Sequence, residues 1–116
     1  MRANIVTLGA MLVSLLSVAT PAHASVLELV CELGKRVSVQ GNQQTDSAID
    51  LRWQGQIYRL LRVATSTGAH RFEDDISGLV WISIPSKAML LDAKRGEPVA
   101  NECKARGGNS SGRPVR

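Results

Sequence analysis

Aromatic, cysteine and histidine residues are all scarce in this chain of 116 residues, and each shortage excludes a class of site. Two Trp, one Tyr and one Phe are too few for an aromatic ligand cage or for a platform on which nucleic-acid bases stack. Two Cys and two His cannot supply the ligands of a zinc centre. We therefore expect no metal, no other cofactor and no nucleic-acid partner.

Motifs of the common enzyme classes are also missing. The sequence has no phosphate-binding glycine loop, no paired-cysteine motif, no zinc-protease motif and no nucleophile elbow. This favours a binding or inhibitory protein over an enzyme. A small hydrolase that uses His70, the only imidazole after residue 24, stays open as an alternative.

The first 24 residues have the pattern of an export signal. Arg2 supplies the positive start, residues 5–18 form an apolar run, and Ala22-His23-Ala24 is an A-x-A cleavage site. The run is too short to cross a bilayer comfortably, so we expect no membrane span. Cleavage after Ala24 predicts a periplasmic or secreted chain that starts at Ser25.

The two cysteines are Cys31 and Cys103, close to the two ends of the body that remains. In an exported chain such a pair most simply forms one disulfide. We expect the folded domain to span residues 25–104. Residues 105–116 are basic and nearly devoid of core-forming side chains, which predicts a disordered tail.

Short segments with period-two alternation make up most of the body. One pair, joined by Gln54-Gly55, has the pattern of a hairpin. Turn signals recur about every 8–12 residues, which is typical of an all-β antiparallel sandwich or barrel, and at this size closure into a barrel is favoured. The expected strands are residues 26–31, 36–40, 49–53, 56–63 and 79–84, and residues 87–91 are either a strand or one helical turn.

The tryptophans and the alternation of strand 56–63 indicate which side chains form the core. Trp53 and Trp81 lie in alternating segments, so we expect at least one of them in the core and not at a ligand site. In strand 56–63, one face carries Tyr58, Leu60 and Arg62, and the other carries Ile57, Arg59, Leu61 and Val63.

Residues 65–75 are the most polar stretch, and we expect them to form a loop. Three hydroxyl residues precede Gly68, and the stretch ends in Glu73-Asp74-Asp75. The three acids could bind calcium, but adjacent carboxylates diverge along an extended chain, which favours a solvated turn. His70 is similarly more typical of a surface histidine than of a catalytic one.

Five features occur in a fixed order along residues 29–103. They are Cys31-Glu32-Leu33-Gly34 with Val37 and Val39; Gly55 with Tyr58 and Leu60; Thr65-Ser66-Thr67-Gly68-Ala69-His70-Arg71-Phe72; Trp81 with Ala88 and Leu90; and Cys103. This order resembles that of the periplasmic and membrane-bound inhibitors of chicken-type (c-type) lysozyme, the MliC/PliC proteins of Gram-negative bacteria. The third feature stands where that family has a Ser-Ala-Ser-Gly-Ala-Lys/Arg-Tyr loop.

The resemblance implies a small antiparallel eight-stranded barrel that inserts this loop into the active-site cleft of a c-type lysozyme. The family's second contact, a Lys-Gly pair after the Trp, is replaced here by Ile82-Ser83-Ile84-Pro85. The lysozyme-binding residues implied are Ser66, Thr67, Gly68, Ala69, His70, Arg71, Ser83 and Lys87.

Chemistry agrees with such a contact. Lysozymes of this type carry two cleft carboxylates, which an inhibitor must meet with hydrogen-bond donors or a cation. We expect Ser66 and Thr67 to supply hydroxyl donors, Arg71 or Lys87 to supply the cation, and Gly68 to allow close backbone approach. The alternative is a barrel that binds another envelope ligand or glycosidase. A monomer and a homodimer both remain open.

Overall fold

The computed structural model of the chain describes residues 9–17 and 25–106. The rest of the expected export signal, residues 1–8 and 18–24, and residues 107–116 of the expected tail lie outside the described residues. The expectation of an all-β domain is confirmed. The elements are β1 (Val26–Val30), a single 3-10 turn η1 (Glu32–Gly34), β2 (Arg36–Gln40), β3 (Ala48–Trp53), β4 (Gln56–Val63), β5 (His70–Glu73), β6 (Leu79–Ile84), β7 (Lys87–Asp92) and β8 (Glu97–Ala105).

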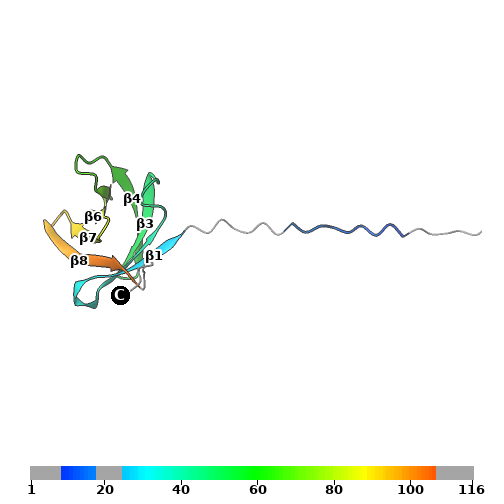
Figure 1. Cartoon of the computed structure of the whole chain (residues 1–116), viewed down its shortest axis with the longest axis horizontal. Helices are drawn as coiled ribbons and strands as arrows, with labels where there is room; N and C mark the ends of the chain where they lie inside the picture. Colours follow the sequence, from blue (N-terminus) through cyan, green and yellow to red (C-terminus); the bar gives the residue numbers. More distant parts are fainter. Residues whose placement is uncertain (1–8, 18–24, 107–116) are drawn as a thin grey trace, which may run out of the picture.

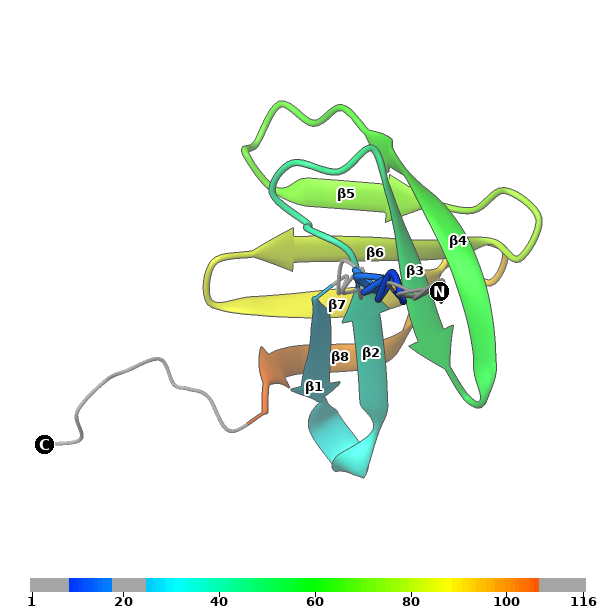
Figure 2. The ribbon, with the colours of Figure 1, turned by 90° about the vertical axis from the view of Figure 1, so that its right-hand side faces the viewer.

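The eight strands form one closed antiparallel barrel (Figure 1). Each strand pairs with the next along the chain, and β8 pairs with β1 to complete the ring. Figure 2 shows β5, β6 and β7 lying across the direction of β1, β2 and β3 at a steep angle. Both the closure and the number of strands agree with the expectation.

The core consists of the inward-facing side chains of all eight strands. Both tryptophans belong to it: Trp81 is fully buried and Trp53 is 8% exposed. In β4 the inward face is the one that carries Leu60, which is fully buried, whereas Ile57 and Leu61 on the other face are exposed. The alternation read from the sequence therefore assigns the faces of β4 correctly.

Two strands depart from the sequence expectation. Strand β5 lies inside residues 65–75, so the expectation of one continuous loop there is wrong, and the loop before β5 is only residues 64–69. Strand β8 was not expected from alternation; its pairing with β7 contains register shifts, and Glu102 has a positive φ of 52°. Residues 87–91 belong to a strand, not to a helical turn.

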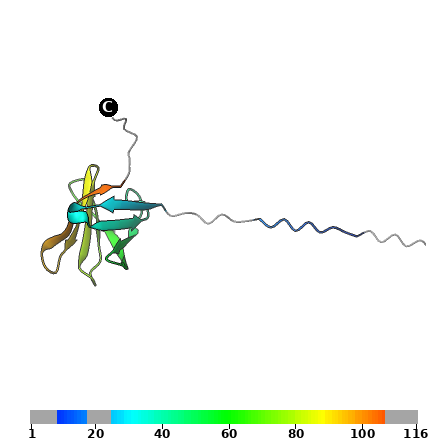
Figure 3. The same cartoon turned by 90° about the horizontal axis from the view of Figure 1, so that it is seen from below.

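The expected disulfide between Cys31 and Cys103 is present, and it lies at the seam where the barrel closes. Among the described residues, the ladder between β1 and β8 contains two pairs, Leu29–Ala105 and Val30–Lys104. Arg106 N also donates to Glu28 O at 2.8 Å, so pairing extends two residues past the expected domain end. Figure 3 shows β1 beside β8 at this seam.

The connections alternate between the two ends of the barrel, because every strand runs antiparallel to its neighbours. Residues 31–35, 54–55, 74–78 and 93–96 form one end, which we call the mouth. Residues 41–47, 64–69 and 85–86 form the other end, which we call the cap end. The site implied by the sequence therefore belongs to the cap end.

Candidate functional site

Loop 64–69 connects β4 to β5 at the cap end and holds its shape through its own hydroxyls. Thr65 Oγ1 donates to Ala69 O at 2.7 Å, and Ala69 N donates to Thr67 Oγ1 at 3.4 Å. Gly68 has a φ of +85°, a backbone conformation that L side chains rarely adopt. These contacts hold the loop in a tight bend.

The tip of this loop presents donors to solvent. Ser66, Thr67 and Gly68 are all exposed. Within the described part of the chain, neither the Ser66 hydroxyl nor the backbone N–H groups of these three residues make a hydrogen bond. The tip therefore offers several donors that a partner's oxygen atoms can satisfy.

Arg71 lies in β5 on the outer face of the barrel, beside the loop. Its Nε contacts Glu73 Oε2, and its side chain is 38% exposed. Val63 and Ile82 are its cross-strand neighbours on either side. A surface hollow of about 470 Å³ separates Arg71 and Ile82 from the loop.

Lys87 begins β7, further round the same outer face. Its Nζ donates to Glu102 Oε2 at 2.6 Å, and this hydrogen bond holds the pKa of the Glu102 carboxyl below its usual range. A second hollow, of about 280 Å³, is lined by Lys87, Glu102 and Ile82. Ile82 thus joins the two hollows, and the fold brings loop 64–69, Arg71 and Lys87 onto one continuous face.

His70 and Ser83 take a different position. They pair across β5 and β6 on the inward face, at the cap end, and both are half-buried. Arg62 Nη1 lies 3.0 Å from His70 Nδ1. Because arginine has no acceptor, Nδ1 must accept, which places the proton of a neutral His70 on Nε2. These two residues therefore do not project with the loop.

Arg62 also belongs to this region, although it was not among the site residues expected from the sequence. Its Nε donates to Asp46 O at 2.8 Å and its Nη2 donates to Gln43 O at 2.6 Å. The guanidinium also lies 4.6 Å from the centre of the Phe72 ring. The sequence did contain one signal for Arg62. It is a cation on the same strand face as Leu60, near the end of the strand.

Gln43 completes the closure of the cap end. Its side-chain Oε1 accepts from Trp81 Nε1 at 2.7 Å, while its backbone oxygen accepts from Arg62. Loop 41–47 is thereby tied to the core tryptophan and to β4. These contacts hold loop 41–47 across the cap end.

The three consecutive acids divide between two elements: Glu73 ends β5 and pairs with Arg71, whereas Asp74 and Asp75 belong to the mouth. Asp74 Oδ2 accepts from Ser77 Oγ at 2.6 Å and from Ser77 N at 3.2 Å, and the first of these bonds holds the pKa of Asp74 below its usual range. Asp75 is exposed. Asp74 and Asp75 therefore belong to a turn, as expected, whereas the expectation that Glu73 belongs to the same solvated turn is wrong.

Among the described residues, no group of three or more His, Cys, Asp or Glu side chains is arranged to hold a metal ion. No helix in that part of the chain combines the length and the apolar character needed to span a bilayer. Comparison with protein-family models, curated proteins and solved structures found no match to this chain.

Proposed function

We propose that this protein is a periplasmic inhibitor of c-type lysozyme that inserts loop 64–69 into the active-site cleft. The observation that carries the proposal is the grouping on one outer face of a donor-bearing loop tip and two cations, Arg71 and Lys87. The resemblance of residues 29–103 to the inhibitor family supports the same reading, since that family is expected to have this barrel.

The loop tip has the chemistry that two cleft carboxylates require. A carboxylate taken out of water loses several kcal/mol of solvation unless donors or a cation replace the water. The Ser66 hydroxyl and the N–H groups of Thr67 and Gly68 belong to exposed residues and have no partner in the described chain, and the Thr67 hydroxyl accepts from Ala69 N but keeps its own proton to donate. Hydrogen bonds from such donors to an ionised acceptor contribute about 1.5–3 kcal/mol each.

Arg71 or Lys87 can supply the cation if it exchanges its carboxylate partner within this protein for a carboxylate of the lysozyme cleft. Arg71 and Lys87 are bound to Glu73 and Glu102 in the free protein. Ion pairs between partly exposed side chains contribute only about 0–1 kcal/mol, so a desolvated cleft carboxylate can replace the resident acid at small cost. The released carboxylate is then free to pair with a cation on the basic lysozyme surface.

The position of His70 favours a binding function over hydrolysis. Its Nδ1 accepts from Arg62, and its Nε2 carries the proton in the neutral form, so neither nitrogen is free to act as a general base. No hydrogen bond joins His70 to its cross-strand neighbour Ser83 among the described residues. The pair thus lacks the contact that activates a serine nucleophile.

The test is inhibition of lysis. We expect the purified protein, mixed with egg-white lysozyme at increasing molar ratio, to protect a bacterial suspension in proportion to its amount until the lysozyme is saturated. Failure to protect against egg-white lysozyme and against other c-type lysozymes would contradict the proposal, and would favour another envelope ligand or glycosidase as the partner.

Substitutions on the outer face that carries loop 64–69, Arg71 and Lys87 test where the lysozyme binds. We expect Thr67→Ala and Arg71→Ala each to weaken inhibition about 10-fold or more, which corresponds to about 1.4 kcal/mol. Arg59→Ala is the matched control, because Arg59 is an exposed arginine on β4 that pairs with Asp50, outside this face. Inhibition that survives both substitutions at full strength would place the contact elsewhere.

A further inference from the structure

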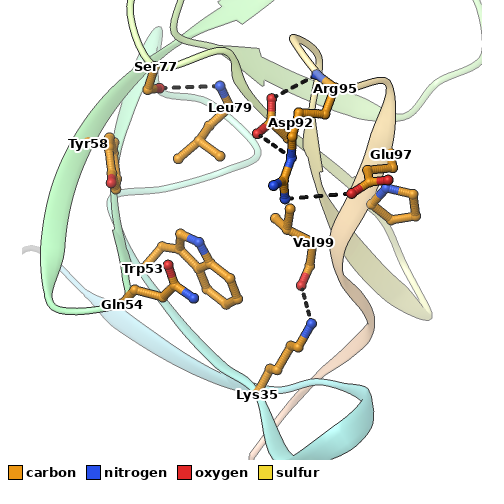
Figure 4. A pocket seen from close by; sticks show the side chains of 11 residues that line it. Lys35, Trp53, Gln54, Tyr58, Ser77, Leu79, Asp92, Arg95, Glu97 and Val99 are labelled. Atoms are coloured by element: carbon orange, nitrogen blue, oxygen red, sulfur yellow. Dashed lines mark hydrogen bonds and ion pairs between the residues drawn. The ribbon is translucent and has the colours of Figure 1, made fainter.

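The mouth of the barrel contains a cavity of about 410 Å³, at the end opposite loop 64–69 (Figure 4). Contributions to its wall come from all four connections at this end, among them Lys35, Gln54, Ser77 and Arg95. The cap end, by contrast, is closed by Arg62. Within the part of the chain that the structure describes, the two ends of the barrel therefore differ: side chains cross the cap end, whereas the mouth holds a cavity that reaches Trp53 and Leu79.

The cavity is lined mainly by polar groups, with a small aromatic area at its floor and side. Trp53 and Leu79, which are 8% and 6% exposed, form its floor, and Tyr58 and Val99 stand on opposite sides. In Figure 4 the Trp53 ring points into the cavity from β3. The exposed part of Trp53 and the half-buried Tyr58 therefore form a small aromatic area among polar groups.

The rim is polar and balanced in charge. The Arg95 guanidinium lies between two carboxylates, 3.4 Å from Asp92 and 3.6 Å from Glu97. Lys35 Nζ donates to Val99 O at 2.8 Å. Two cations and two anions thus face the cavity, and a ligand with a net charge of either sign gains little from this arrangement.

Gln54 occupies an unfavourable backbone conformation at the rim. Its φ is +50°, and it precedes Gly55 in a two-residue hairpin turn. Asn, Asp and Gly are the residues that usually fill the first position of such a turn. The turn carries a longer amide instead, and that amide lines the cavity. Backbone strain of this kind concentrates at binding sites.

We propose that the mouth binds a small neutral saccharide. A sugar ring combines a small apolar C–H face, which the aromatic area of Trp53 and Tyr58 can contact, with hydroxyls that both donate and accept and so suit a cavity lined mainly by polar groups. Planar groups match neighbouring hydroxyls: Arg95 presents paired donors, Asp92 presents paired acceptors, and the Gln54 amide presents a donor group beside an acceptor. The cavity volume falls within the ordinary range for small-molecule sites. This activity is independent of lysozyme inhibition, which involves the other end.

The intrinsic fluorescence of the full protein reports on this site directly. We expect glucose, galactose, N-acetylglucosamine or maltose, titrated one at a time to high millimolar concentration, to change the emission in a saturable way for at least one sugar. Trp81 is fully buried, so the change should come from Trp53. In Trp53→Phe the response should disappear. The absence of saturable binding with all four sugars would overturn the proposal, as would binding of inorganic phosphate in their place.

Two rim variants keep the test valid even if Trp53→Phe unfolds the protein. We expect Arg95→Ala to weaken sugar binding at least 10-fold, whereas Arg59→Ala leaves it unchanged. Gln54→Asn should raise the urea midpoint of unfolding, because asparagine suits the turn better, and should weaken binding at the same time. Sugar affinity that is unchanged in both Arg95→Ala and Gln54→Asn would overturn the assignment of the site. Lysozyme inhibition should be unaffected in these variants, which separates the two proposals.

Discussion

The Arg62 guanidinium joins loop 41–47 to strand β5 at the cap end. It donates to the carbonyl oxygens of Gln43 and Asp46 and to His70 Nδ1, and it lies over the Phe72 ring. Charged donors make stronger hydrogen bonds than neutral ones, and a planar guanidinium can serve several acceptors at fixed angles. A lysine at this position would reach fewer of them.

Replacement of Arg62 tests this role. We expect Arg62→Ala to lower the free energy of unfolding by about 2 kcal/mol, because it leaves the carbonyl oxygens of loop 41–47 without their donor. Urea unfolding at neutral pH measures the change. Arg59→Ala is the control: Arg59 is 69% exposed with a single ion pair, so its loss should cost less than about 1 kcal/mol. Equal losses in the two variants would contradict the pinning role of Arg62.

Candidate site residues could be read from the sequence only in part. The hydroxyls of loop 64–69 were identified because three of them precede a glycine, and the structure places this loop on the surface. Arg62 was missed because its role depends on loop 41–47 folding back over the end of β4, a contact between segments with no local signal. The inward direction of His70 was missed for a related reason, since β5 was taken for loop.

At the level of elements, alternation identified strands that are long and regular. Strands β3 and β4 and the turn between them follow the period-two pattern closely. Strand β5 is four residues long and only Phe72 in it is buried, so its polar residues resemble a loop. Strand β8 contains Pro98 and pairs irregularly with β7, which breaks the pattern. Pairing with neighbours, not local composition, makes these two segments strands.

The turn 74–78 allows a pH-dependent prediction. The hydrogen bond from Ser77 Oγ lowers the pKa of Asp74 in the folded state, so the ionised carboxylate stabilises the fold at neutral pH. This contribution is present above the usual pKa of an aspartate and is lost as the pH falls through the lowered value. We expect Ser77→Ala to destabilise the protein by about 1 kcal/mol or somewhat more at pH 7.

The same substitution should cost less in acid. Once Asp74 is protonated, its hydrogen bond with Ser77 Oγ loses the charge on the acceptor and is weaker, while the bond from Leu79 N to Ser77 Oγ is unchanged. Urea unfolding of both proteins at pH 7 and at pH 2.5–3, a window of about 4 units, measures the difference. Ser86→Ala, in the exposed turn 85–86, is the matched control and should change little at either pH. A penalty for Ser77→Ala that is the same at both pH values would contradict the role of the Asp74 carboxylate.

At the scale of the whole molecule, the ladder with the fewest residue pairs in the described part of the chain coincides with the disulfide. Strands β1 and β8 share two residue pairs, and Cys31 and Cys103, separated by 72 positions, are bonded next to them. Restricting a loop of that length in the unfolded chain contributes about 4 kcal/mol in the chain-entropy model. We expect reduction, or the double variant Cys31→Ala/Cys103→Ala, to lower the free energy of unfolding by about this amount.

Urea unfolding with and without dithiothreitol measures this effect. The double variant is also the control, because dithiothreitol should not change its stability. If the seam opens, β1 and β8 become free edges, and edges of this kind pair with other chains. We therefore expect the reduced protein to form oligomers in size-exclusion chromatography that the oxidised protein does not form. A reduced protein as stable as the oxidised one would contradict the stapling role.

The alternation of connections between mouth and cap end has a consequence for engineering. No residue of loop 64–69 shares a turn with the residues around the mouth cavity, and the packed core separates the two groups. New peptide sequences can therefore be grafted between Val63 and His70, for display or selection, without altering the opposite opening. The barrel can serve as a scaffold in which the cap end and the mouth are varied independently.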